Sequence, residues 1–159
     1  MTNVNVLAGT SMAFVGFLLC AVGMGTEAWI TFSKGGVSPF SLGLSSASGA
    51  VDAVQALTVI GVMLAVAGIC LGVAHLVFEH LEKEPLPWFL KAAGGCLIGG
   101  GIFMIIGDII WLGKIYFDVL KAKDDLGYSF YLCIVGGLIL LASGGVILKE
   151  KKEANAVNP

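Results

Sequence analysis

The chain has 159 residues, of which 57% are hydrophobic and only 13% are charged. Soluble globular proteins carry about 25% charged residues, so the composition excludes a soluble domain and indicates an integral membrane protein. The formal net charge is −2, and the nine basic residues are all lysine. Because no extended basic surface can form from so few lysines, nucleic-acid binding is not expected. The 23 glycines, in so apolar a chain, are typical of helices that pack closely in lipid.

Four stretches of about 20 apolar residues predict four membrane-spanning helices. They cover residues 6–29, 54–78, 88–113 and 128–148. The N-terminus lacks the basic segment and the cleavage site of a signal peptide, so we expect the first span to be an uncleaved anchor. The spans leave no room for a separate soluble domain, which predicts one membrane domain over residues 1–159 with both termini on the same side.

The connecting segments differ in kind. Outer loops are expected at residues 30–53 and 114–127, with an inner loop at 79–87 and a polar tail at 149–159. In the first outer loop, two apolar segments that flank Lys34-Gly35-Gly36 predict an extracellular β-hairpin or small sheet. Apolar residues keep a helical spacing after Leu112, so the third helix is expected to continue beyond the membrane to about Ala122. Five lysines on the tail side against four on the other weakly favour cytoplasmic termini.

Small residues recur at steps of three and four along the spans. A spacing of about 3.5 residues keeps one face toward a neighbouring helix, and it predicts a left-handed four-helix bundle. Small side chains on that face allow the backbones to approach closely. The predicted helix-packing residues are Gly9, Ala13, Gly16, Gly23, Gly61, Ala65, Gly68, Gly72, Gly95, Gly99, Gly137 and Gly144. Gly100 and Gly101 lie off the main stripe of the third span, so we expect them to contact a partner.

The possible reactive groups favour a structural interpretation. Asp108 lies in the third span at about 12 Å from its middle, near the edge of the hydrocarbon, where a carboxylate costs less than at the centre. It is a candidate polar membrane site, either interfacial and hydrogen-bonded or part of an ion pathway. The four cysteines all fall within spans, and no motif for catalysis, for a cofactor or for a metal is present. We therefore expect a protein that is not an enzyme.

The order of segments, together with three short motifs, resembles the claudin superfamily. Trp29 closes the first span, Val54-Gln55-Ala56-Leu57 opens the second, and Gly127-Tyr128-Ser129 opens the fourth. The superfamily includes the peripheral myelin protein, the epithelial membrane proteins and the calcium-channel gamma subunits. The resemblance implies a plasma-membrane tetraspan that binds other membrane proteins or forms junctions.

The first outer loop departs from the pattern of that superfamily. The Gly-Leu-Trp segment and the paired cysteines are reduced here to Leu42-Gly43-Leu44, and the loop has about half the expected length. Its only charged residues are Lys34 and Asp52, which argues against a selective paracellular pore. An outer loop this apolar is expected to contact lipid, the bundle or a partner protein. The candidate partner contacts in this loop are Phe32, Val37, Phe40, Leu42 and Leu44.

Three functions remain open at this point. The first is a non-enzymatic auxiliary or structural subunit that associates laterally with another integral membrane protein or with itself. The second is adhesion between cells or membranes through the outer loop, as in a junction protein. The third is a small channel or transporter that uses Asp108.

Overall fold

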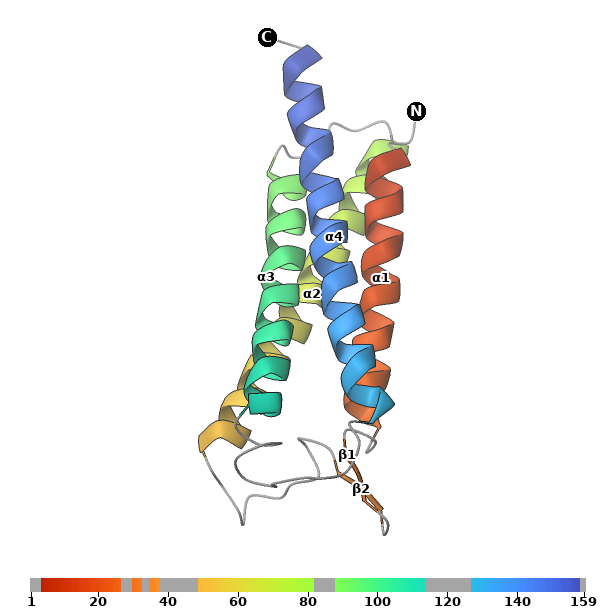
Figure 1. Cartoon of the computed structure of the whole chain (residues 1–159). Coiled ribbons are helices and arrows are strands. Elements are labelled where there is room, and N and C mark those ends of the chain that lie inside the picture. Colours follow the sequence, from red (N-terminus) through yellow and green to blue (C-terminus); the bar gives the residue numbers. More distant parts are fainter. Residues whose placement is uncertain are drawn as a thin grey trace.

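The computed structural model describes residues 4–26, 30–32, 35–37, 49–81, 88–113 and 127–157. Four helices account for most of them: α1 (Val4–Gly25), α2 (Gly49–His80), α3 (Phe89–Ile110) and α4 (Tyr128–Val157). Two short strands, β1 (Ile30–Phe32) and β2 (Gly35–Val37), lie between α1 and α2 in the sequence (Figure 1). The prediction of an all-α bundle with four long apolar helices is confirmed.

Each helix is long and apolar enough to cross a membrane. The spanning segments are Val4–Gly25, Asp52–His80, Phe89–Gly113 and Tyr128–Lys149, and their mean hydropathy lies between 2.0 and 2.5. At 1.5 Å per residue, 22 residues reach about 33 Å, which matches a hydrocarbon core of about 30 Å. A helix also satisfies its own backbone hydrogen bonds, as lipid requires.

The helices form a bundle in which neighbours in the packing are not always neighbours in the sequence. The extensive contacts are α1 with α4, α4 with α3, and α3 with α2, whereas α1 and α2 touch over a smaller area. The beginning of α1 and the end of α4 lie at the same end of the bundle, which we call the tail end (Figure 1). The strands lie beyond the opposite end, which we call the hairpin end.

The interior is built from small and medium apolar side chains. Its central cluster comprises Ala13, Cys20, Ala65, Ala93, Leu97, Met104, Leu140 and Ile147, all at most 3% exposed. Large apolar side chains cover the outside as well, including Leu7, Phe14, Met63, Ile109 and Leu138. A helix that is apolar on every side is expected for a membrane span, so the outward residues face lipid or a partner rather than water.

The helix ends differ from the predicted boundaries by a few residues. α1 is described to Gly25, and the predicted end at residue 29 lies outside the described residues. α2 begins at Gly49 rather than at residue 54. α4 continues through the charged tail to Val157, so the part of the tail up to that residue is helical.

The two strands pair antiparallel, with Ile30 opposite Val37 and Phe32 opposite Gly35. Gly35 and Gly36 therefore belong to β2 rather than to the turn between the strands. The expected extension of α3 to Ala122 falls on residues 114–122, which lie outside the described part of the chain. The handedness of the bundle stays a prediction.

Candidate functional site

Glycines make a very close contact between α1 and α4. A Cβ added at Gly16 would lie 3.0 Å from the carbonyl oxygen of Gly136, and one added at Gly9 would lie 2.7 Å from Cγ1 of Ile147. Both distances are shorter than real Cβ contacts normally allow. At Gly16 an added side chain would press on the backbone of α4, and at Gly9 it would press on the Ile147 side chain, so glycine at both positions allows the two helices to pack closely.

Two cysteines complete this interface, and the side chain of each one lies over a glycine of the opposite helix. The Sγ atom of Cys20 lies in the notch over Gly136 and 3.6 Å from the carbonyl oxygen of Cys133. The Sγ atom of Cys133 lies over Gly23 and 3.8 Å from the carbonyl oxygen of Cys20. Both thiols are buried and free, and they serve here as small apolar side chains that interlock two helices.

The interfaces of α3 use the same device. A Cβ at Gly61 on α2 would lie 3.0 Å from the carbonyl oxygen of Gly100, and one at Gly100 would lie 2.8 Å from the carbonyl oxygen of Gly61. Towards α4, a Cβ at Gly101 would lie 2.7 Å from the carbonyl oxygen of Gly137. Gly68 lies over the Leu97 side chain on α3, and Gly144 lies over Ile98. Helix α3 therefore packs closely on two sides at once.

The predicted roles of the glycines on α3 must be corrected. Gly100 and Gly101, which we expected to contact a partner, are buried against α2 and α4. Gly95, which we expected inside, is exposed, and nothing lies within 4 Å of its Cβ position. Gly99 is only partly buried, with Leu64 at 3.5 Å. The reason is that α3 lies between two neighbours, so its buried face is wider than the single stripe assumed from the spacing.

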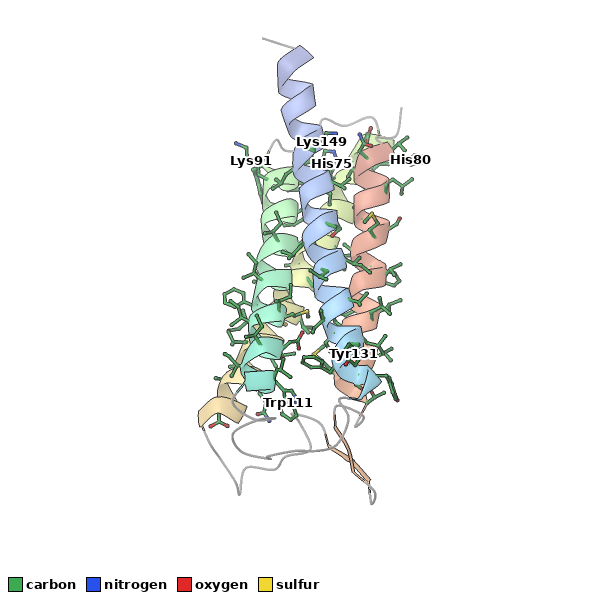
Figure 2. All side chains as sticks on the ribbon, in the orientation of Figure 1. His75, His80, Lys91, Trp111, Tyr131 and Lys149 are labelled. Carbon is green, nitrogen blue, oxygen red and sulfur yellow. The ribbon has the colours of Figure 1, made fainter. Side chains whose placement is uncertain are left out.

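The contact between α1 and α2 includes a polar side chain. A Cβ at Gly72 would lie 2.7 Å from the hydroxyl oxygen of Thr10, which is 6% exposed. Ala13 and Ala65 are fully buried further along the same two helices. His75 follows one turn after Gly72 and is 8% exposed. His75 lies at the tail end of the bundle, with His80, Lys91 and Lys149 near the same level (Figure 2).

Asp108 lies deeper inside the protein than we expected from the sequence. Its side chain is 4% exposed, and its Oδ2 atom has no hydrogen-bond partner within the described part of the chain. The neighbouring Gly107 has the hydroxyl oxygen of Thr58 at 3.3 Å from its Cβ position, so α2 covers this side of α3. Burial within the protein does not test the depth of Asp108 in the membrane, so its interfacial position stays a prediction. It remains a candidate polar membrane site inside the hairpin end of the bundle.

The interior of the bundle between its two ends is filled. Ala65, Leu97, Met104 and Leu140 are all at most 3% exposed in the central cluster. The described core thus places packed apolar side chains between Asp108 and the polar residues at the tail end. A water-filled pathway through the bundle would need these side chains to move apart.

Near Asp108, one hydrogen bond joins α4 to the segment that follows α1. The hydroxyl oxygens of Thr26 and Ser129 are 2.6 Å apart, and Ser129 is fully buried. Trp111 is fully buried at the same end, whereas Tyr131 is exposed there (Figure 2). This bond fixes the end of α1 against the start of α4, directly before the chain enters the strands.

The loop residues predicted to contact a partner are only partly described. Phe32 and Val37 end strands β1 and β2, and the structure describes their backbone but not their side chains. Phe40, Leu42 and Leu44 lie outside the described residues. Within the described part of the chain, no group of three or more His, Cys, Asp or Glu residues could hold a metal ion.

Comparison with known families agrees with this architecture. Residues 1–150 match the model of the family described as tight junction protein, claudin-like. The chain belongs to the claudin-like family. No curated protein sequence matches it. The claudin-like chain is thus a tetraspan membrane protein of the tight-junction type, and proteins of this family generally have structural rather than enzymatic roles.

Sequence reasoning missed several residues of the interior. Gly94 and Gly136 are as closely packed as the predicted glycines, since a Cβ at Gly94 would lie 3.1 Å from the carbonyl oxygen of Gly144. Each of them belongs to a pair of glycines that are adjacent in the sequence. If each helix is assumed to have two neighbours, a search for such pairs finds both. Thr10 and His75 gave no signal, because a single polar residue in an apolar span does not reveal which side it faces.

Proposed function

We propose that this claudin-like tetraspan associates laterally in the membrane with another integral membrane protein or with a second copy, as a structural or auxiliary subunit. The observation that carries the proposal is a pair of glycines on the outside of the bundle. Gly95 on α3 and Gly145 on α4 are both exposed, and nothing lies within 4 Å of either Cβ position.

The two glycines lie at the same depth and on the same side of the bundle. Gly95 directly follows Gly94, and Gly145 directly follows Gly144. Gly94 and Gly144 face each other across the α3–α4 contact: the Cβ position of Gly94 lies 3.1 Å from the Gly144 carbonyl oxygen, and the Cβ position of Gly144 lies 2.8 Å from the Gly94 carbonyl oxygen. A step of one residue along an α-helix turns the side-chain direction by about 100° around the helix axis. Because α3 and α4 run antiparallel, these rotations have opposite senses when viewed from one end of the bundle. The Cβ positions of Gly95 and Gly145 therefore point to the same outer side. We call the surface formed by Gly95, Gly99, Ala142 and Gly145 the outer glycine surface.

An exposed surface of small residues suits a helix of a partner. In lipid, association is driven by close van der Waals packing rather than by the hydrophobic effect, and small residues permit that packing. The inner glycines are already used by the bundle, whereas the outer glycine surface is free of contacts from the described part of the chain. Large apolar side chains such as Ile102 and Leu138 border it and would pack against the flanks of the partner helix.

Co-purification in a mild detergent tests the proposal. A second membrane protein or a second copy should accompany the wild-type chain and should be lost when Gly95→Leu and Gly145→Leu are introduced. Ala8→Leu is the matched control, because Ala8 is an exposed small residue on α1, a helix that contributes nothing to the outer glycine surface. If the wild-type chain runs alone at every detergent concentration, or if the control variant loses the partner equally, the proposal is wrong.

Adhesion between membranes is the second candidate function. Membership of a family described as tight junction protein favours it, and so does the antiparallel pair of strands beyond the helix ends. In this proposal the strands lie outside the cell, the termini are cytoplasmic and the protein is at the plasma membrane. Vesicles that carry the purified protein with the strands outward should then aggregate, whereas vesicles with lipid alone should not. Failure of the protein-containing vesicles to aggregate would contradict adhesion.

The ion pathway through Asp108 has less support. The central cluster separates Asp108 from the polar residues of the tail end with side chains at most 3% exposed. A channel role would require flux in liposomes that Asp108→Asn abolishes.

A further inference from the structure

Lys91 and Lys149 lie at the tail end of the bundle, on the two helices that form the outer glycine surface (Figure 2). Both side chains are exposed. Lys91 precedes Gly95 by four residues on α3, and Lys149 follows Gly145 by four residues on α4. Residues four apart share one side of a helix, so each lysine lies one turn beyond a glycine of this surface, towards the tail end. The outer glycine surface is therefore bordered at the tail end by one lysine from each helix.

The depth of the two lysines matches the membrane interface. Lys149 is the last residue of the spanning segment Tyr128–Lys149, and Lys91 is the third residue of Phe89–Gly113. Trp88, three residues before Lys91, is 51% exposed, and tryptophan is enriched at the interface between bilayer and water. Lysines at the ends of spans extend their ammonium groups to this level, while their methylene groups stay on the apolar helix surface. Two positive charges therefore lie beside the head groups, where the outer glycine surface ends.

The charge of this border is positive. Among the side chains of α3 and α4 that the structure describes, the remaining charged one is Asp108, which lies at the hairpin end. Residues 150–153 of the tail are Glu-Lys-Lys-Glu, so their formal charges cancel. Lys91 and Lys149 thus set the sign of the charge that a partner on this side of the bundle meets at the tail end.

A second copy of the chain is disfavoured by this charge. In a symmetric pair within one membrane, both copies have the same orientation, and identical surfaces face each other at the same depth. Lys91 and Lys149 of one copy would then lie beside the same lysines of the other, and like charges placed together at an interface cost free energy. A partner helix with carboxylates at that depth would instead form ion pairs with both lysines.

The small residues favour a helix over a lipid molecule as the occupant. Acyl chains are flexible and fit against any apolar surface, whereas a rigid helix gains close contact only where small residues let the backbones approach. Nothing lies within 4 Å of the Cβ position of Gly95 or of Gly145. We propose that the partner of the outer glycine surface is a helix of a different membrane protein, and that this helix carries acidic residues at its tail-side end that pair with Lys91 and Lys149. This inference rests on the lateral association proposed above.

Binding of synthetic single-span helices to the purified full chain tests the proposal. Three peptides share a Gly-x-x-x-Gly face and differ only in the residues at both of their ends, which are glutamate, glutamine or lysine. Because both ends are alike, the result does not depend on the orientation of the peptide. Energy transfer in phosphatidylcholine vesicles should show that the glutamate peptide binds about fivefold more tightly than the glutamine peptide, as two exposed ion pairs predict. The lysine peptide should bind most weakly, and Gly95→Leu should weaken the binding of all three.

Charge variants show whether the preference arises at the two lysines. Lys91→Gln together with Lys149→Gln should make the binding of the glutamate and glutamine peptides equal. Lys91→Glu together with Lys149→Glu should reverse the order, so that the lysine peptide binds most tightly. His80→Glu is the matched control, because it adds a negative charge near the same level on α2, outside the outer glycine surface (Figure 2). It should leave the order unchanged.

The possible outcomes separate this inference from the lateral association itself. Equal binding of the glutamate and glutamine peptides by the wild-type chain, with loss of both in Gly95→Leu, would overturn the acidic partner and leave the association in place. Failure of all three peptides to bind would contradict both. Two differently tagged copies that co-purify, and that Gly95→Leu separates, would overturn the inference in favour of a second copy. Retention of phosphatidylglycerol that is lost in the double glutamine variant, without any peptide preference, would assign the lysines to an anionic lipid instead.

Discussion

Replacement of Gly101 by alanine should separate α3 from α4. The added Cβ would lie 2.7 Å from the carbonyl oxygen of Gly137 and 2.9 Å from Cγ of Leu141, whereas ordinary contact begins at 3.4 Å. The first neighbour is backbone and cannot rotate away. The two helices must therefore move apart locally by about 0.7 Å, which forfeits about a quarter to a half of the dispersion energy at each neighbouring contact.

The magnitude follows from two opposing effects. Overpacking of a close contact typically costs about 1–3 kcal/mol. Alanine has a higher helix propensity than glycine by up to about 1 kcal/mol, which offsets part of that cost. We expect a net loss of about 1–2 kcal/mol in the free energy of unfolding. Gly95→Ala provides the matched control on the same helix, because nothing lies within 4 Å of its Cβ position and only the propensity gain remains.

Unfolding of the purified protein by sodium dodecyl sulfate in mixed micelles, followed by circular dichroism and tryptophan fluorescence, measures both variants. Gly101→Ala should unfold at a lower detergent fraction than the wild type, and Gly95→Ala at the same or a higher one. If Gly101→Ala is as stable as the wild type, or if both variants lose the same stability, then close backbone contact between α3 and α4 does not hold the bundle together.

Three further predictions concern the polar residues and the junction of α1 with α2. Asp108→Asn should stabilise the bundle by about 1 kcal/mol or more, because it removes a buried charge whose Oδ2 has no hydrogen-bond partner among the described residues; a lower unfolding midpoint would mean that the carboxylate is used in the folded state. Thr26→Val should lower the free energy of unfolding by about 0.6 kcal/mol, because it removes the hydrogen bond to Ser129. If a double-mutant cycle with Ser129→Ala shows no coupling energy between the two residues, that hydrogen bond does not contribute to stability. Gly72→Ala should cost less than Gly101→Ala, because its nearest neighbour is the Thr10 side chain rather than backbone; equal losses in the same unfolding assay would show that the α1–α2 contact is just as rigid.

The sequence predicted the spans well because length and hydropathy alone decide which segments can cross a bilayer. Residues such as Gly16 and Gly61 were also placed inside from their spacing, and the structure puts both against backbone atoms of a neighbouring helix. Spacing identifies one face of a helix, but it does not tell how many neighbours the helix has. That is why Gly101 and Gly95 were assigned to the wrong sides of α3.

The polar residues were harder to predict for a different reason. Asp108 was placed near the interface by its depth along the span, and depth says nothing about the direction of a side chain around the helix axis. The structure shows it 4% exposed. Thr10 was passed over as an isolated residue, and only the packing of α1 on α2 shows that its hydroxyl lies against Gly72.

Photo-crosslinking within the membrane tests the lateral association most directly. A benzophenone amino acid at Leu138, which is 53% exposed and borders the outer glycine surface, should form adducts with another membrane protein or with a second copy of the chain. The same probe at Met63, which is 67% exposed on α2, should form adducts with lipid. Protein adducts from Leu138 that disappear in Gly95→Leu are the predicted result. Lipid adducts alone from both positions would contradict the proposed association.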